Sequence, residues 1–128
     1  MKIMTRKSLA VEQLPGRAIQ KAVGRDSASL TDEMTVGFAF YSEASGPMQP
    51  HRHAEETVIV LESRDAQVRF GSSPSSLGEA VELQAGDTLH IPAGEWHVFT
   101  YGPGGSLDIA FVYGKTQDLR PEENPRPA

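Results

Sequence analysis

The chain has 128 residues, a length that indicates one domain large enough to bury a hydrophobic core. Its formal net charge is −5 and no basic run departs from that average, which argues against a nucleic-acid partner. It has no cysteine, which excludes disulfides and thiolate metal sites. It also has no apolar run long enough to cross a bilayer. The basic N-terminus lacks the apolar stretch of a secretory signal, so we expect a cytoplasmic protein that does not enter a membrane.

The N-terminal third of the chain predicts an irregular arm followed by two strands. Residues 1–17 have weak periodicity and end at a Pro-Gly pair, which favours an arm. Residues 18–23 alternate well enough for a strand, and a polar loop follows them. Residues 34–43, MTVGFAFYSE, place apolar side chains at alternate positions and therefore predict a second strand.

The remainder of the chain predicts several short strands separated by turns. The expected strands cover residues 57–62, 65–70, 79–84, 87–91, 96–101 and 106–113. The connections, such as ESRD, GSSPSSLG and YGPGGS, are short and rich in turn residues. This spacing is typical of an all-β sandwich or barrel, which we place at residues 18–116. Residues 117–128 contain three prolines and few apolar side chains, so we expect a flexible tail.

The expected strand at residues 57–62 bears on whether the protein forms a dimer. Residues 58–61, VIVL, are apolar at every position, so both faces of this strand should be covered. One face can meet the barrel interior, and the other needs either the N-terminal arm or a second subunit. The sequence therefore predicts a homodimer as one way to cover this strand.

Two histidines precede that strand in the stretch HRHAEETVIVLE. In an extended segment His51 and His53 project to the same face, while Arg52 projects to the other. Pro50 favours an extended residue before it. Neutral imidazole is a common ligand of transition metals. Taken alone, the pair indicates either a metal site or a solvated polar loop.

A second group of residues lies downstream in GDTLHIPAGEWH. Gly86 and Asp87 predict a hairpin turn, TLHI a short strand, and PAGE a second tight turn. That turn brings His97 to the start of the next strand. One imidazole is thereby expected at the rim of a sheet, where residues from another hairpin can meet it.

Together these two stretches resemble the motifs of the cupin superfamily. The first runs Gly46, four residues, His51-x-His53, two residues, Glu56, six residues, with Ser63 where glycine is usual. The second runs Gly86, five residues, Pro92-x-Gly94, two residues, His97, with Tyr101 where the family often has asparagine. The resemblance covers residues 46–101. It implies a small single-domain cupin, an antiparallel barrel similar to a double-sheet jelly roll.

The resemblance implies a metal centre held by His51, His53, Glu56 and His97. The first motif is one residue short on each side of the histidine pair, so the carboxylate is open to a second reading. Simple alternation from His53 selects Glu55, whereas counting back from the end of the strand selects Glu56. We favour Glu56 as the ligand.

Three imidazoles and one carboxylate suit Fe, Mn, Ni, Zn, Co or Cu. Phe99 and Tyr101 share the face of His97 by alternation, and we expect Tyr101 to line the cavity with a catalytic hydroxyl. Glu56 is a candidate base, and we expect His90 to be a structural or cavity-lining residue and not a ligand. We therefore expect a metal-dependent enzyme of the dioxygenase, isomerase or lyase type acting on a polar small molecule. A cupin that binds a small molecule or a metal without turnover is the alternative.

Overall fold

The computed structural model describes residues 1–120, and in this part of the chain it contains β-strands, two single-turn 3-10 helices and no α-helix. The helical turns are η1 (Arg6–Ser8) and η2 (Glu43–Ser45). The strands are β1 (Glu12–Leu14), β2 (Arg17–Gly24), β3 (Ser29–Leu30), β4 (Thr35–Ser42), β5 (Glu56–Gly71), β6 (Val81–Glu82), β7 (Thr88–Ile91) and β8 (Trp96–Tyr113). The all-β prediction is confirmed.

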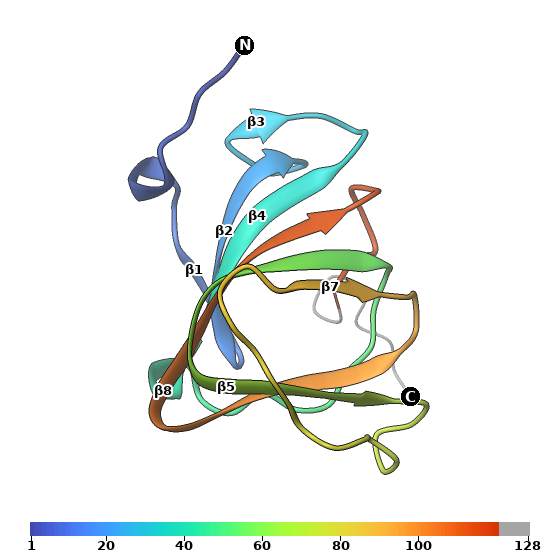
Figure 1. Cartoon of the computed structure of the whole chain (residues 1–128). Coiled ribbons are helices and arrows are strands. Elements are labelled where there is room, and N and C mark those ends of the chain that lie inside the picture. Colours follow the sequence, from blue (N-terminus) through green and yellow to red (C-terminus); the bar gives the residue numbers. More distant parts are fainter. Residues whose placement is uncertain (121–128) are drawn as a thin grey trace.

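The strands form one curved sheet that wraps around the core as an open barrel (Figure 1). Their order is β1-β2-β4-β8-β5-β6, and β7 pairs with the first part of β5. All pairings are antiparallel except that of β2 with the short β3. Strands β1 and β6 stand at the two ends of this order, so the barrel is not closed by hydrogen bonds. Both β6 and β7 lie along the free side of β5.

Strands β5 and β8 each join two strands that the sequence predicts as separate. In β5 the register shifts between Val60 and Glu62 and again between Arg64 and Ala66. In β8, residues 102–105 stand opposite Asp65 alone. The turn-rich segments ESRD and YGPGGS therefore act as bulges, which bend a strand at a corner of the barrel without ending it.

The core lies inside the curved sheet, and β5 and β8 supply much of it. Their buried residues alternate along each strand and face each other across the ladder, as in the pairs Val58–Phe111 and Val60–Ile109. The outward residues of VIVL are not covered by the arm. Ile59 is 39% exposed and Leu61 41% exposed.

Arg6 makes several of the contacts that attach the N-terminal arm to the outer surface of the sheet, in addition to the pairing of β1 with β2. Two guanidinium nitrogens of Arg6 donate to the two carboxylate oxygens of Asp108 on β8, at 2.8 and 2.6 Å. A third nitrogen donates to Gln20, and the guanidinium carbon lies 4.4 Å from the centre of the Phe38 ring. The arm is therefore held by a paired, stacked cation, a geometry specific to arginine.

We expect Arg6→Ala to lower the free energy of unfolding by about 2 kcal/mol, because hydrogen bonds to charged groups and ring stacking are lost together. Arg25→Ala is the matched control, since Arg25 pairs with an exposed Asp32 and such pairs contribute about 0.5 kcal/mol. Urea unfolding of both variants measures the difference. Equal losses would show that Arg6 contributes no more to stability than a surface ion pair.

The segment after β8 returns to the core before the described residues end. The side chains of Leu119 and Arg120 are buried, and the backbone nitrogen of Ala54 donates to the carbonyl of Leu119 at 3.1 Å. These two residues belong to the stretch that we predicted as a flexible tail, but an apolar anchor holds them against the barrel. Residues 121–128 of that prediction lie outside the described part of the chain. Within residues 1–120, no helix has both the length and the apolar character of a membrane span.

Candidate metal centre

Three histidines from two segments meet at one end of the barrel. His51 and His53 lie on the segment between η2 and β5, and His97 lies near the start of β8. The backbones of His51 and His97 are joined by two hydrogen bonds, of 3.0 and 2.9 Å, in an antiparallel bridge. This bridge brings the HxH segment against β8, so side chains more than 40 residues apart in sequence share one site.

Each of the three imidazoles has its Nδ1 atom against a backbone carbonyl oxygen. The distances are 2.9 Å from His51 to Gln49, 2.7 Å from His53 to Ala54 and 2.9 Å from His97 to Glu95. A carbonyl oxygen can only accept, so each Nδ1 carries the proton and donates it. In the neutral ring the Nε2 atom then presents a lone pair, which is the tautomer that a metal ligand needs.

The geometry of the donor atoms fits a single transition-metal ion. One ring nitrogen from each histidine lies within 4.8 Å of the other two, and the Nε2 atoms of His53 and His97 are 3.1 Å apart. Two nitrogens bound at about 2.1 Å with a right angle between them would lie about 3.0 Å apart. Since the protons are on Nδ1, these two lone pairs face each other, and a cation between them would remove the repulsion.

His97 is held in its neutral form by its surroundings. Burial, followed by the neighbouring His51 and His53, lowers the pKa of His97 to about 3, although the hydrogen bond to the carbonyl of Glu95 opposes this shift. A positive charge on this ring would lose its hydration without gaining an anionic partner. His97 is therefore available as a ligand at neutral pH without first losing a proton.

Glu56, at the start of β5, lies beside the histidines. Its Oε1 atom is 3.4 Å from the Nε2 atom of His53, and the residue is buried. Burial raises the pKa of Glu56 to about 7, although a hydrogen bond from the Tyr113 hydroxyl and the charges of Arg17 and Arg120 oppose the rise. The site therefore contains a carboxyl group that can exchange a proton near neutral pH.

The neighbouring glutamate points elsewhere. Glu55 is exposed and its Oε2 atom lies 2.6 Å from the Nε2 atom of His90 on β7. Strand β5 begins only at Glu56, so the intervening loop does not preserve the alternation that starts at His53. Of the two glutamates considered from the sequence, Glu56 is the one that faces the histidines. His90 lies outside the cluster.

The histidines and Glu56 line a narrow cavity of about 20 Å³, enough for a water molecule or an ion. The other lining residues are Arg17, Ile19, Ala39, Tyr41, Phe99, Phe111, Tyr113 and Arg120. Tyr113 is the last residue of the strand expected at residues 106–113. It is the cross-strand partner of Glu56, and a correct β5–β8 register could have revealed it. No sequence signal indicated Arg120, because it lies in the predicted tail.

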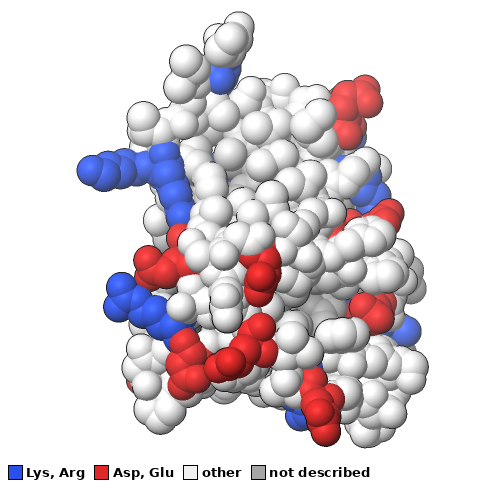
Figure 2. All heavy atoms as spheres, viewed as in Figure 1, with Lys and Arg blue, Asp and Glu red and all other residues white. Residues whose placement is uncertain are grey.

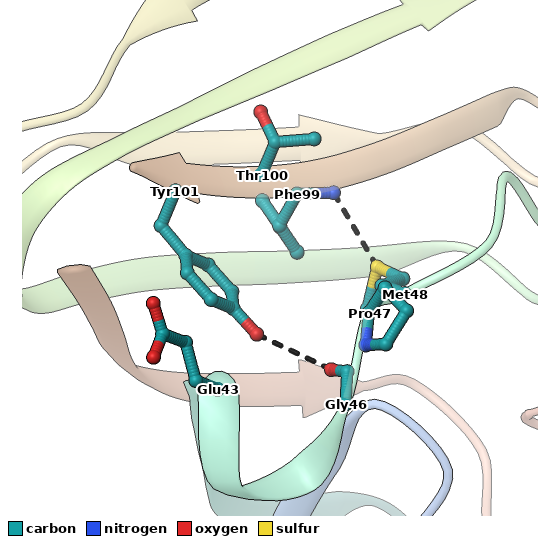
Figure 3. A pocket seen from close by; sticks show the side chains of 7 residues that line it. All are labelled: Glu43, Gly46, Pro47, Met48, Phe99, Thr100 and Tyr101. Atoms are coloured by element: carbon teal, nitrogen blue, oxygen red, sulfur yellow. Dashed lines mark hydrogen bonds between the residues drawn. The ribbon is translucent and has the colours of Figure 1, made fainter. Parts of the chain in front are cut away.

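Tyr101 lies in a different pocket from the one expected. Its hydroxyl faces the carbonyl oxygens of Ser42 and Gly46, at 2.8 and 3.3 Å, in a pocket of about 290 Å³ beside η2 (Figure 3). Tyr101 shares a face with His97, but four residues along a strand span about 13 Å. Phe99 lies between them and lines both cavities. The predicted catalytic role of Tyr101 has no contact with the histidines to support it.

Metal binding at this cluster is expected to strengthen as the pH rises to about 7. In the metal-free protein Glu56 carries a proton below its raised pKa of about 7, whereas a bound dication favours the carboxylate. Binding then releases this proton, so the association constant rises by up to about tenfold per pH unit below pH 7. Calorimetry in buffers of different ionisation enthalpy counts the released protons. Glu56→Gln should release one proton fewer, and equal release by both proteins would contradict this role.

Comparisons with known proteins add the fold family to this geometry. No protein-family model matches the chain, and no curated protein matches its sequence. Among solved structures, the polyketide cyclase RemF from Streptomyces resistomycificus is 26% identical with a TM-score of 0.68, over 88% of this chain and 78% of the cyclase. Hydroxypropylphosphonic acid epoxidase from S. wedmorenis is 15% identical with a TM-score of 0.64, over 88% of this chain and 58% of the epoxidase. Oxalate decarboxylase from Lactobacillus farciminis is 16% identical with a TM-score of 0.66, over 88% of this chain and 33% of the decarboxylase.

These neighbours share the cupin fold, and they include metal-dependent enzymes. The chain spans only part of the epoxidase and about one third of the decarboxylase. With its open antiparallel barrel and three clustered histidines, the protein has the fold of the cupin superfamily.

Proposed function

We propose that this cupin is a metal-dependent enzyme of the dioxygenase, isomerase or lyase type, acting on a small molecule with polar groups. His51, His53 and His97 are the histidine ligands in this proposal, and Glu56 is the fourth donor. The observation that carries it is the convergence of three imidazoles whose Nδ1 protons are all committed to carbonyl oxygens. Side chains that merely filled a core would have no reason to share this tautomer.

A divalent transition metal at this site, such as Fe, Mn, Ni, Zn, Co or Cu, would supply Lewis acidity or oxygen chemistry. The chain's own residues supply the rest. The carbonyl oxygens of Gln49, Ala54 and Glu95 keep the imidazoles oriented. When Glu56 lies beside the metal without binding it, its carboxylate can accept a proton from a bound substrate, because burial raises its pKa to about 7 in the metal-free site. The Tyr113 hydroxyl, hydrogen-bonded to Glu56, holds this carboxylate in place.

Elemental analysis of protein purified without a metal-affinity tag tests the proposal. We expect about one transition-metal ion per chain and its loss in His51→Ala. Reconstitution with each candidate metal, followed by substrate screening, then identifies the metal that supports turnover. Absence of metal from the wild-type protein even after reconstitution would overturn the proposal.

The alternative is a module that binds a metal or small molecule without turnover. The inner cavity is compatible with it, because about 20 Å³ is enough for an ion or a water molecule. A binding module should be stabilised against heat by its ligand without forming product. An enzyme should lose turnover on chelation and regain it with one particular metal.

We also propose that the protein forms a homodimer through the outer face of β5. The exposed side chains of Ile59 and Leu61 support this, because the arm is attached elsewhere, at Asp108 and Phe38. Sedimentation at micromolar concentration should show a dimer, and Leu61→Glu should shift it to monomer. A wild-type protein that remains monomeric at that concentration would contradict the proposal.

A further inference from the structure

A groove outside the inner cavity reaches one of the proposed ligands. It has a volume of about 350 Å³ and lies where β5, β6 and β7 border the open side of the barrel, with His97 among its lining residues. Most of the lining is apolar. These side chains are Val68, Phe70, Val81, Leu83, Leu89 and Ile91. Phe70 is 46% exposed and Val81 49% exposed, so both present apolar surface that a ligand could cover.

The charged groups of this groove all have one sign at neutral pH. Glu82 on β6, Asp87 before β7 and Glu95 before β8 line it, and within residues 1–120 no lysine or arginine does. His90 also lines it, beside Glu55. In Figure 2, acidic side chains lie around a hollow on the face in front of β7. A ligand that carries a negative charge would therefore meet repulsion on entry.

The volume and the lining together indicate the shape of a suitable ligand. An apolar cavity of roughly 150 Å³ is enough to hold benzene, so this groove can take a ring with a substituent. Pockets that bind organic molecules are mostly apolar with a few polar groups that set the orientation. Here the polar end is the imidazole of His97, which belongs to both the groove and the inner cavity.

We propose that this groove holds the apolar ring of the substrate, and that the substrate is uncharged or cationic at the end away from the metal. Oxygen atoms at the other end of the molecule reach the histidine cluster past His97. The proposal rests on the proposed function, since it names the substrate class of the same site. The acidic rim sets the sign of the charge that is accepted, and the apolar walls select a ring over an open polar chain.

Dopamine and 3,4-dihydroxyphenylacetate are a matched pair of probes, because both have a ring with two adjacent oxygens and they differ in the charge at the far end. Calorimetry with zinc-loaded protein is expected to show tighter binding of dopamine by roughly tenfold. Three exposed ion pairs, each contributing a factor of about two to five, are enough for this ratio. Equal affinities, or a preference for the anion, would overturn the proposal.

Variants locate the effect in the groove. Replacing both carboxylates in Glu82→Gln/Glu95→Gln should reduce the affinity ratio to the factor of about two to five that Asp87 alone supplies, and Val81→Lys should reduce it by about as much as the loss of one carboxylate. Glu79→Gln is the control, because Glu79 is exposed and close to β6 but does not line the groove. If the ratio of the affinities for dopamine and 3,4-dihydroxyphenylacetate is the same in the wild type and all three variants, the charge preference arises outside the groove.

Metal-free protein separates this inference from the proposed function. Phenethylamine and phenylacetate lack the adjacent oxygens, so their binding depends on the groove alone. We expect the amine to shift the methyl resonances of Leu83 and Ile91 at lower concentration than the acid. If the protein binds no metal but retains this preference, the metal proposal fails and the groove stands. If it binds metal but neither probe shifts these methyls, the groove assignment fails.

Discussion

Replacement of His97 by alanine is expected to abolish stable metal binding. The Nε2 atom of His97 lies 3.1 Å from that of His53. The His97 side chain is only 1% exposed, so bulk water does not reach the position of this ligand in the wild-type protein. Loss of a supporting residue around a metal typically costs about 10- to 100-fold in affinity, and loss of a direct ligand should exceed a hundredfold. Metal content after dialysis and calorimetric titration measure the loss.

His90→Ala is the matched control for this variant. His90 is exposed and pairs with Glu55 outside the cluster, so its removal should leave the metal content unchanged. Because His97 is buried, each variant is also unfolded in urea without metal. A folded His97→Ala protein that retains one metal ion per chain would exclude His97 as a ligand. Loss of metal from both variants would mean that the histidine at β7 belongs to the site.

Replacement of Phe111 by alanine is expected to lower the free energy of unfolding by about 3–5 kcal/mol. Phe111 is 3% exposed, faces Val58 across the β5–β8 ladder and lines the cavity that holds the histidines and Glu56. Its removal would also admit water next to Glu56. Because burial is what raises the pKa of Glu56, we expect that pKa to fall from about 7 toward its ordinary value of 4.5.

Two measurements follow these two effects separately. Urea unfolding gives the stability, and carboxyl carbon chemical shifts of the metal-free protein followed with pH give the pKa of Glu56. Phe40→Ala is the control, because Phe40 is 39% exposed on β4 and should cost about 1 kcal/mol without changing Glu56. A large loss of stability with no change in that pKa would show that Phe111 packs the core without excluding water from Glu56.

Local sequence patterns predicted the class of fold and the positions of most strands along the chain. Alternation along residues 34–43 and 106–113 corresponds to β4 and to the second part of β8, because side-chain direction in a strand has a period of two. The same local rule failed at ESRD and YGPGGS. These segments contain residues suited to turns, but Asp65 with its positive φ of 55° and residues 102–105 form a bulge between two continuing strands.

Some residues of the candidate site could be predicted from local sequence patterns, and others could not. His51 and His53 share a face by their spacing alone, and the tight turn at residues 92–95 was expected to bring His97 to the start of a strand. The carboxylate could not be assigned so simply. Glu56 and not Glu55 faces the cluster because β5 begins after a loop that interrupts the alternation. Sequence spacing does not reveal where such an interruption falls.

The sequence by itself determined that the protein is built of strands, that it carries the histidines of a cupin and that the glutamate pair stands next to them. These features depend on neighbours within a few residues, where backbone geometry is periodic. Only the tertiary structure placed Tyr113 against Glu56 and brought Arg120 to the inner cavity, and it moved Tyr101 into another pocket. Those contacts depend on cross-strand register and on bulges, which are set by packing between segments far apart in the chain.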